Sequence, residues 1–579
     1  MIEVTNLCFK YERGSKHSLN GIDLKIGEGE VILVLGPSGS GKSTLALTFN
    51  GLIPHSFPGE MSGMVHVCGM ESFKTPVYEL TQKVGIVFQD PEAQFVSMNV
   101  EDEIVFALEN LCYPPEKMEE RLVEALSKVD MLDYRYRDVY SLSGGEKQKI
   151  LLAALMAIRP SILIFDEPTA NLDPMGTLEF FETVKSLKET DKHTIILIEH
   201  KLDDLIHIID RVVVIGKEGT KLVEGTPSEV FGEHAAMLIQ EGIWMPQTAL
   251  LANKLKENDI NSCDVPLNIK EACEYLKNLK LHPENSKNGY SGVVSNDNLN
   301  PALEVRYLSF SYDKNKIIEN FSLKVAKGDF LAIVGANGAG KTTLAKHLVN
   351  IIRPSHGKVF IEGKDVLDIP TKDLSHKIGY VFQNPEHQFI KNTVEEQLTF
   401  GLELNGLSPG EIESWLDSTL ERFRIKPYAK MSPYMLSHGQ KRLLSVATML
   451  TLGQDILILD EPTFGQDLKS SRELLALLDS LNQEGKTIII ITHDMTLVAK
   501  HAKNVVVMNA GKAIYSGSAH ELFKNEEILE KARLTPPPLL KLSSCLSKYD
   551  ENWKGLSTPE EFVNALKSAN TLNSQEGSK

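Results

Sequence analysis

Short runs of apolar residues alternate along the chain with segments that have the periodicity of helices. Three such runs occur in each half, at 31–35, 162–165 and 194–198, and again at 330–334, 456–459 and 487–491. Strands that are apolar throughout and separated by helices indicate a parallel sheet covered on both faces. Since ligands of such sheets bind at the carboxyl ends of the strands, we expect the polar residues that follow these runs to form a site.

The motifs of the chain occur twice in the same order. GPSGSGKST at 36 returns as GANGAGKTT at 335, VFQDPEAQF at 87 as VFQNPEHQF at 381, LSGGEKQK at 142 as LSHGQKRL at 436, ILIFDEPT at 162 as ILILDEPT at 456, and LIEH at 197 as IITH at 490. Duplication on this scale predicts two copies of one α/β domain. A length of 579 residues is also too great for a single hydrophobic core.

The tails of the two copies correspond as well. GIWMPQTALLANKL near residue 242 is similar to RLTPPPLLKLSSCL near residue 533, and each precedes a short helix-like stretch, at 269–279 and 559–566. We therefore predict a first domain at 1–240, an appendage and linker at 241–300, a second domain at 301–525 and an appendage at 526–579. The stretch at 285–300 is rich in Asn, Ser and Gly, which is the composition of a flexible linker.

Each copy contains a glycine-rich loop of the pattern G-x4-G-K-[ST] directly after an apolar run. In this pattern, backbone N–H groups and the following helix N-terminus bind phosphates, and the lysine reaches the β- and γ-phosphates. One match could be a chance glycine-rich turn, but a second match in the same setting makes that reading negligible. The predicted ATP-binding loops are Gly36, Pro37, Ser38, Gly39, Ser40, Gly41, Lys42, Ser43 and Thr44, and Gly335, Ala336, Asn337, Gly338, Ala339, Gly340, Lys341, Thr342 and Thr343.

Polar residues after the other apolar runs predict phosphoryl chemistry, which needs mainly positioning and charge neutralisation. The predicted Mg²⁺ ligands are Ser43, Asp166, Thr342 and Asp460. The predicted catalytic residues, which polarise or orient the attacking water or sense the γ-phosphate, are Glu167, Glu461, His200, His493, Gln89 and Gln383. A strand-end carboxylate that only caps the next helix is the alternative. The glycine-rich loops about 120 residues upstream, within the span of one domain, argue against it.

Charge and composition narrow the class of partner. The chain has 61 Lys and Arg against 78 Asp and Glu, a net charge of −17, which disfavours a protein that tracks nucleic-acid phosphates. The start MIEVTNLCFKY lacks the pattern of a signal peptide. Because no apolar run approaches the roughly 20 residues of a membrane span, we expect any membrane connection to run through a partner. Six cysteines form no CxxC pair and are expected as free thiols of a reducing cytosol: Cys8, Cys68, Cys112, Cys263, Cys273 and Cys545.

LSGGE at 142–146, upstream of ILIFDEPT, resembles the signature sequence of ABC ATPases, and the resemblance covers both copies. It implies an α/β fold of two tandem P-loop NTPase (ABC ATPase) domains with parallel-sheet cores, each followed by a small helical C-terminal appendage. By the same resemblance Tyr11 and Tyr312 stack on adenine, although such tyrosines can also serve ordinary strand packing. Asp173 and Asp467 match the aspartate of the D-loop that crosses between halves.

In this family two halves pair head to tail, and each ATP lies between one P-loop and the opposite signature. We expect this pairing within one chain, although the sequence leaves pairing across two chains open. One site then combines Lys42, Gln89, Asp166, Glu167 and His200 with Ser437, His438 and Gly439. The other combines Lys341, Gln383, Asp460, Glu461 and His493 with Ser143, Gly144 and Gly145.

The segments VFQDPEAQF and VFQNPEHQF resemble the FQ[DN]P[DE]xQ stretch of energy-coupling-factor (ECF) importer ATPases. The appendages are similar to the dimerisation segments of that group. GLIPHSFPGEMSG at 51 resembles its duplicated members, which are linked to thiamine-precursor uptake. The resemblance implies an ATP-hydrolysing subunit of an importer for a vitamin, a vitamin precursor or a metal ion. It would lie at the cytoplasmic face of the cell membrane, with a transmembrane coupling subunit and a substrate-binding subunit as integral partners.

Two other functions fit a tandem ABC protein. A soluble ATPase acting on ribosomes is the alternative, and the acidic charge and the absence of a long basic linker argue against it. A chromosome or DNA-repair ATPase would carry a long coiled coil between P-loop and signature, and the spacing from Lys42 to Ser143 leaves no room for one. The basic flanks at 147–149 and 441–442 follow the signatures on the same predicted helix. We expect a solvated helix face or a subunit contact there.

The second copy departs from the family pattern at two places. His438 replaces the glycine found as Gly144 in the first copy, at a position where glycine allows close backbone approach to the γ-phosphate. A histidine can crowd that approach, donate a hydrogen bond, or point away and change little. The D-loop reads FGQD at 464–467 in the second copy against ANLD at 170–173 in the first.

These departures predict unequal sites. The site that joins Lys341 to the intact LSGGE should hydrolyse ATP faster than the site that joins Lys42 to LSHGQ. We therefore expect Glu461→Gln to remove more of the steady-state ATPase rate than Glu167→Gln. Equal losses, or a larger loss from Glu167→Gln, would contradict this ranking.

Overall fold

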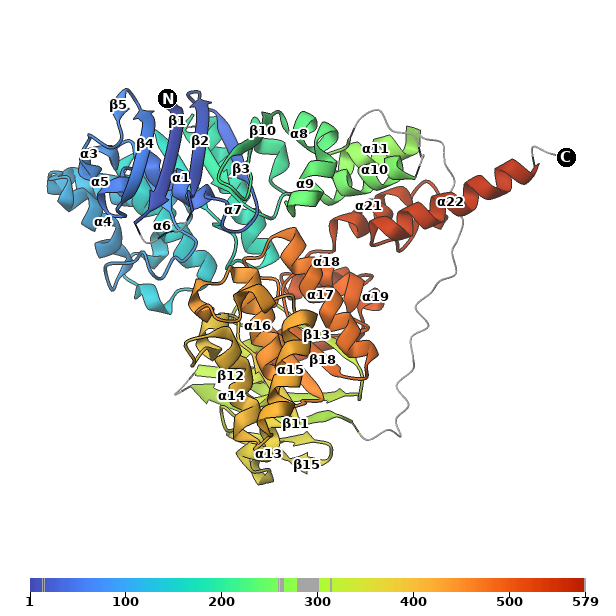
Figure 1. Ribbon diagram of the computed structural model, residues 1–579. Coiled ribbons are helices and arrows are strands. Elements are labelled where there is room, and N and C mark those ends of the chain that lie inside the picture. The colour runs from blue at the N-terminus through green and yellow to red at the C-terminus, as the bar shows by residue number, and fades with distance from the viewer. Residues whose placement is uncertain are drawn as a thin grey trace. The chain divides into compact units, whose positions relative to one another are not determined.

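The computed structural model describes residues 1–278 and 301–576, apart from 13, 15, 191, 259, 261–264, 313 and 314. The predicted linker at 285–300 and Cys263 lie outside the described residues. The chain divides into two compact units, Met1–Lys280 and Leu281–Lys579 (Figure 1). Each unit contains one six-stranded sheet and one four-stranded sheet.

The first unit is built on a sheet of order β10-β9-β3-β8-β7-β6, in which β9 to β6 are parallel and β10 is antiparallel. Its strands are β3 (Val31–Leu35), β6 (Val84–Val87), β7 (Ile162–Asp166), β8 (Thr194–Ile198), β9 (Arg211–Ile215) and β10 (Lys221–Gly225). An antiparallel sheet of order β2-β1-β4-β5 comprises β1 (Ile2–Tyr11), β2 (Leu19–Ile26), β4 (Gly59–Val67) and β5 (Met70–Glu71).

The helices of the first unit follow the strands as the alternating pattern predicts. They are α1 (Lys42–Phe49), α2 (Leu52–His55), α3 (Val77–Leu80), α4 (Val100–Asn110), α5 (Pro115–Lys128), α6 (Gly144–Ile158), α7 (Pro174–Thr190), α8 (Pro227–Glu233), α9 (Ala235–Glu241), α10 (Gln247–Glu257) and α11 (Ile269–Asn278). The last two lie in the predicted appendage.

The second unit repeats this arrangement. Its larger sheet has the order β16-β17-β18-β13-β19-β20, with strands β13 (Phe330–Val334), β16 (Ile378–Val381), β17 (Ile456–Asp460), β18 (Thr487–Ile491), β19 (Asn504–Asn509) and β20 (Lys512–Ser518). The antiparallel sheet contains β11 (Leu303–Tyr312), β12 (Asn315–Val325), β14 (His356–Ile361) and β15 (Lys364–Asp365). The two sheet topologies match strand for strand, as the duplicated sequence predicts.

Most helices of the second unit correspond to those of the first, but among the described residues α2 has no helical counterpart there, and α18 stands where the first unit has a 3-10 turn at Ile206–Ile208. The helices of the second unit are α12 (Lys341–Leu348), α13 (Thr371–Ser375), α14 (Val394–Leu404), α15 (Pro409–Arg422), α16 (His438–Leu450), α17 (Leu468–Gln483), α18 (Met495–His501), α19 (Ala519–Leu522), α20 (Glu526–Lys531), α21 (Pro538–Leu546) and α22 (Pro559–Glu576). None of the helices in the described part of the chain combines the length and the hydrophobicity that a membrane crossing needs.

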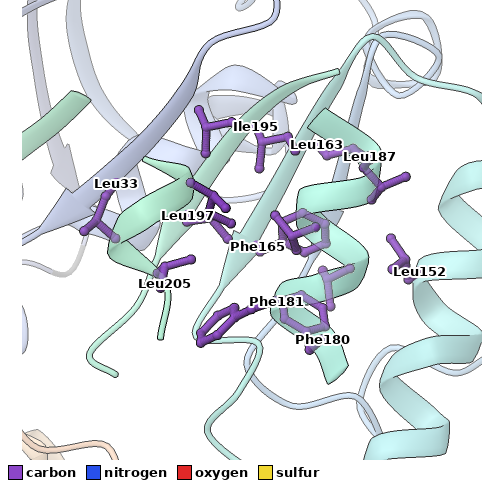
Figure 2. Packing of buried hydrophobic residues seen from close by; sticks show 14 of the residues in the cluster. Leu33, Leu152, Leu163, Phe165, Phe180, Phe181, Leu187, Ile195, Leu197 and Leu205 are labelled. Carbon is purple, nitrogen blue, oxygen red and sulfur yellow. The ribbon is translucent and has the colours of Figure 1, made fainter. Parts of the chain in front are cut away.

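The continuous apolar runs have a direct explanation in the packing. Alternate residues of a strand point to opposite faces, and both faces of the larger sheet are covered. Val31 and Leu33 of β3 pack into the cluster formed with the long helices, whereas Ile32 and Val34 pack into the cluster shared with the antiparallel sheet and α1. Figure 2 shows the helix side of the sheet, where the ring of Phe165 meets Phe180 of α7 edge to face at 5.3 Å between centroids.

Candidate functional site

The glycine-rich loop of the first unit fits between neighbouring backbone segments that leave no room for a side chain. A Cβ atom on Gly41 would lie 2.2 Å from the carbonyl oxygen of Ser18, and one on Gly36 would lie 2.3 Å from that of Ile215. Gly41 also has a φ of 97°, in the left-handed region that favours glycine. The loop conformation that joins β3 to α1 therefore depends on these glycines.

The lysine of the loop is buried and held by the loop itself. The Lys42 ammonium donates to the carbonyl oxygens of Gly36 at 2.8 Å and Pro37 at 3.0 Å. Helix α1 starts after Gly41, which has no side chain to cap the first N–H groups. Orphan N–H groups at a helix start, next to a lysine, make an anion-binding site.

The second unit builds the same loop. A Cβ atom on Gly335 would lie 2.1 Å from the carbonyl oxygen of Met508, and Gly340 has a φ of 95°. The Lys341 ammonium donates to the carbonyl oxygens of Gly335 and Ala336, both at 2.8 Å. Both predicted phosphate loops are thus present as loops between a central strand and a helix.

The strand-end aspartates lie beside the hydroxyl groups that follow the lysines. Thr342 Oγ1 donates to Asp460 Oδ2 at 2.8 Å, and the Ser43 hydroxyl is hydrogen-bonded to the Asp166 carboxylate. Burial raises the pKa of Asp166 to about 6, with the Ser43 hydrogen bond opposing the shift and the Glu167 charge adding to it. Burial raises the pKa of Asp460 as well. Each predicted pair of oxygen ligands is therefore brought together.

The adjacent glutamates are held in an uncommon backbone conformation. Glu167 has a φ of 48° and Glu461 a φ of 44°. Their N–H groups donate to the last residues of the neighbouring strands, Ile198 and Ile491, both at 2.8 Å. A non-glycine residue in the left-handed region is strained by about 1 kcal/mol or more and persists only where its surroundings hold it. This positive-φ backbone conformation turns the chain at the two glutamates away from the direction of the preceding strands.

In the first unit three predicted catalytic side chains meet. Gln89 Nε2 donates to Glu167 Oε2 at 2.8 Å, and His200 Nε2 lies 3.1 Å from Glu167 Oε1. They lie just after the ends of β6, β7 and β8, which are neighbours in the sheet. The parallel order thus gathers residues that are 33 and 78 positions apart in sequence.

The glutamate of the second unit has different partners. His493 Nδ1 lies 2.8 Å from Glu461 Oε1, and Thr492 Oγ1 donates to Glu461 Oε2 at 3.2 Å. Within the described part of the chain the Gln383 amide does not bond Glu461. The predicted triad therefore assembles in full in the first unit and without its glutamine in the second.

Both signatures form the N-termini of long helices. Ser143 caps α6 and Ser437 caps α16, in each case within a capping box closed by the residue three positions later. Gly439 is packed closely, because a Cβ atom there would lie 2.5 Å from Ser470 Oγ of α17. The pairing of each signature with the opposite P-loop stays a prediction.

The tyrosines and the D-loop aspartates have local partners. The Tyr11 hydroxyl lies 3.1 Å from Thr44 Oγ1 of the first loop, and its ring meets Phe9 edge to face. Tyr312 is 47% exposed and meets Phe310 in the same way. Asp173 and Asp467 accept hydrogen bonds at the starts of α7 and α17, from Gly176 and Ser470. Stacking of these tyrosines on adenine stays a prediction.

Of the two expectations for the basic flanks of the signatures, the solvated helix face is wrong for three of their residues, and the subunit contact stays a prediction. Lys147 is buried and pairs with Glu92, and Lys441 pairs with Glu386 at 2.6 Å. Arg442 is fully buried. These contacts join each signature helix to the loop that follows Gln89 or Gln383. The recurrence of Lys and Glu at matching positions of the two copies was a signal that could have revealed these pairs.

The steric fit of the first loop generates a prediction. Gly41→Ala should abolish nucleotide binding by the first unit, because the added methyl group collides with the Ser18 carbonyl and displaces the loop. Gly39→Ala is the matched control: it has a similar φ of 77° but nothing within 4 Å of the added atom, and should weaken binding much less. Binding of a fluorescent ATP analogue in a Lys341→Ala background measures both, and equal effects would contradict the steric explanation.

Comparisons with known proteins agree with this geometry. The family model "ABC transporter" matches residues 19–170 and 318–464. A Methanosarcina acetivorans protein named "Putative ABC transporter ATP-binding protein" is 37% identical over 98% of this chain and 94% of its own length. The Bacillus subtilis "Putative HMP/thiamine import ATP-binding protein YkoD" is 36% identical over 93% of this chain and 95% of its own. A solved Clostridium perfringens structure, cbiO1, part of the ABC transporter complex cbiONQ, is 34% identical over 40% of this chain and 94% of its own, with a TM-score of 0.37. The chain belongs to the ABC transporter ATP-binding proteins, as an ATPase with two ABC domains in one polypeptide.

Proposed function

We propose that this protein is the ATP-hydrolysing, energy-coupling subunit of an ECF-type membrane importer for a vitamin, a vitamin precursor or a metal ion. The observation that carries the proposal is the near full-length similarity to a relative whose name states HMP/thiamine import. The ECF-like segments after Gln89 and Gln383 support it. On this proposal the chain lies at the cytoplasmic face of the membrane, against integral transport subunits.

Mg²⁺ fits the residues at both phosphate loops. It binds few protein ligands, prefers oxygen, and takes its remaining ligands from phosphates and water. Thr342 and Asp460 supply a hydroxyl and a carboxylate oxygen within 2.8 Å of each other, and Ser43 and Asp166 supply the same pair in the first unit. When bound, the ion would neutralise phosphate charge. These four residues are the ones that would hold it.

The remaining steps fall to side chains of this chain. Lys42 and Lys341 can exchange their loop carbonyls for the β- and γ-phosphates. Glu167 and Glu461 can accept a hydrogen bond from the attacking water, with His200 and His493 holding the two carboxylates. We propose that each ATP is shared between one P-loop and the opposite signature, so that binding closes the halves and hydrolysis reopens them.

Exposed apolar side chains beside the Q-loops suit a membrane partner. We use Q-loop for residues 87–95 and 381–389. In the first unit the Val139 N–H donates to the Met98 carbonyl oxygen, which brings the segment after the Q-loop next to the segment before the signature. The exposed side chains on these two segments are Val96, Met98, Tyr136 and Tyr140. In the second unit the Tyr434 hydroxyl donates to the Phe389 carbonyl, and the exposed side chains are Ile390, Met431, Tyr434 and Met435. Clustered exposed apolar groups mark interaction sites.

The membrane partner is testable by capture. Full-length protein drawn from detergent-solubilised membranes should retain a hydrophobic integral protein. Met98→Asp combined with Ile390→Asp should release it, because each places a charge in an apolar contact, while ATP binding persists. Tyr78→Asp, at a residue 64% exposed elsewhere on the first unit, is the matched control and should keep the partner. Co-sedimentation with ribosomes in place of membrane capture would overturn the proposal.

The raised pKa of Asp166 predicts how Mg²⁺ dependence varies with pH. Above about pH 6 the carboxylate is ionised, and below it a proton competes with the ion. In a Lys341→Ala background, the Mg²⁺ concentration for half-maximal ATP binding should rise about tenfold per pH unit below that value. Because the phosphates of ATP also take up protons, the pH slope of the Asp166→Asn variant supplies the baseline for this measurement. Identical pH slopes for parent and Asp166→Asn would contradict a role for Asp166 in holding the ion.

A further inference from the structure

Arg442 is a charged side chain of the second unit that is fully buried. It lies on α16, four residues after the helix start, and its side chain is 0% exposed. Alignment of LSGGEKQ at 142 with LSHGQKR at 436 places Gln148 at the same position in the first unit. A buried guanidinium loses its hydration and is stable only where hydrogen bonds replace it. Burial lowers the pKa of Arg442 to about 10.

The guanidinium binds main-chain carbonyl groups from two other segments. Nη1 donates to the carbonyl oxygen of Phe382, and Nη2 donates to those of Gln383 at 2.6 Å and Glu461 at 3.2 Å. One side chain therefore joins the signature helix α16, the second Q-loop and the residue that follows β17. Arginine suits this task because its donors have a fixed planar geometry.

A second substitution accompanies Arg442. Tyr380 of β16 is buried, and its hydroxyl donates to Asp460 Oδ2 at 2.9 Å. Ile86 stands at this position in the first unit, where no hydroxyl is available. The charges of Asp460 and Glu461 favour the protonated guanidinium of Arg442. In the second unit Tyr380 and Arg442 thus occupy the positions of Ile86 and Gln148 in the first. Tyr380 bonds the Asp460 carboxylate and Arg442 bonds the Glu461 carbonyl.

The two units consequently hold their catalytic glutamates by different means. In the first, the Gln89 side chain bonds the Glu167 carboxylate directly. In the second, Arg442 ties the backbone of Gln383 to the backbone of Glu461, and the Gln383 amide does not bond the carboxylate within the described residues. The second Q-loop is therefore fixed whether or not its glutamine touches the acid.

We propose that Arg442, supported by Tyr380, is a positioning residue that clamps the second Q-loop and Glu461 to the second signature helix, and that hydrolysis by the second unit depends on this clamp. Among the described residues of the first unit, the Gln148 amide nitrogen forms no such clamp, and hydrolysis by that unit should not depend on Gln148. The inference rests on the proposed role of Glu461 as the hydrolytic acid, and the experiment separates the two.

The test isolates the second unit with a Glu167→Gln background. In that background Arg442→Gln should lower kcat for ATP by about tenfold or more, because a misplaced catalytic group costs at least that much. KM should change less than about twofold, because the phosphate loop is untouched. Arg442→Lys keeps the positive charge but lacks the planar set of guanidinium donors, so it should restore little of the kcat that Arg442→Gln loses. If Arg442→Gln folds poorly, the Tyr380→Ile/Arg442→Gln double variant reproduces the pair found in the first unit.

Three controls separate positioning from general stability. Arg422→Gln removes an exposed arginine, paired with Glu484, and should leave kcat unchanged. In a Glu461→Gln background, where the first unit turns over, Arg442→Gln should lower kcat clearly less than in the Glu167→Gln background, because the first unit would use only the start of α16 and neither the second Q-loop nor Glu461. Hydrogen exchange of residues 381–389 should speed up in Arg442→Gln while ATP binding persists.

The possible results have distinct meanings. An equal fall in kcat in both backgrounds, or full activity of Arg442→Gln or Arg442→Lys, would overturn the clamp. If Glu461→Gln fails to abolish the turnover left by Glu167→Gln, the assigned acid is wrong. If Glu461→Gln abolishes it and Arg442→Gln has no effect, the acid stands and only the clamp is rejected.

Discussion

Each half of this protein is organised around charged groups buried at the carboxyl edge of a sheet that is apolar on both faces. A charge taken out of water is stable only where hydrogen bonds replace its hydration. Lys42 and Lys341 find them in loop carbonyls, and Asp460 finds them in Thr342 and Tyr380. The strand order of each sheet serves this requirement, because it sets the loop, the aspartate and the histidine side by side.

The duplication provides an internal comparison that a single domain cannot offer. Glycines that exclude a Cβ atom, a lysine on two carbonyls, and a glutamate with positive φ occur in both units. These shared features are the ones on which the proposed ATP chemistry depends. The support behind the glutamate differs, with Gln89 in the first unit and the Arg442 clamp in the second. The contacts around the acids thus differ through Arg442 and Tyr380, which are not the departures noted at His438 and at 464–467.

Several residues that the family resemblance assigns to nucleotide or interface contacts also form hydrogen bonds within their own unit. Tyr11 bonds Thr44 of the phosphate loop, and Asp173 and Asp467 accept hydrogen bonds at helix starts. The Lys–Glu pairs at 147 and 92, and at 441 and 386, join each signature helix to its Q-loop. The same ion pair therefore ties the signature helix to the Q-loop in both units.

By itself the sequence determined the duplication, the α/β class, the two phosphate loops and the acids beside them. These features depend on local patterns: apolar runs, fixed glycine spacing, and residues placed directly after strands. Lys147, Lys441 and Arg442 were expected on a solvated face or at a subunit contact, and the solvated face is wrong, because a basic residue on a helix gives no local sign of what covers it. Only the tertiary structure decided that Arg442 is buried, since its three acceptors are carbonyl groups 19, 59 and 60 residues away. Carbonyl groups are common to all residues, so no side-chain pattern could have named them as its partners.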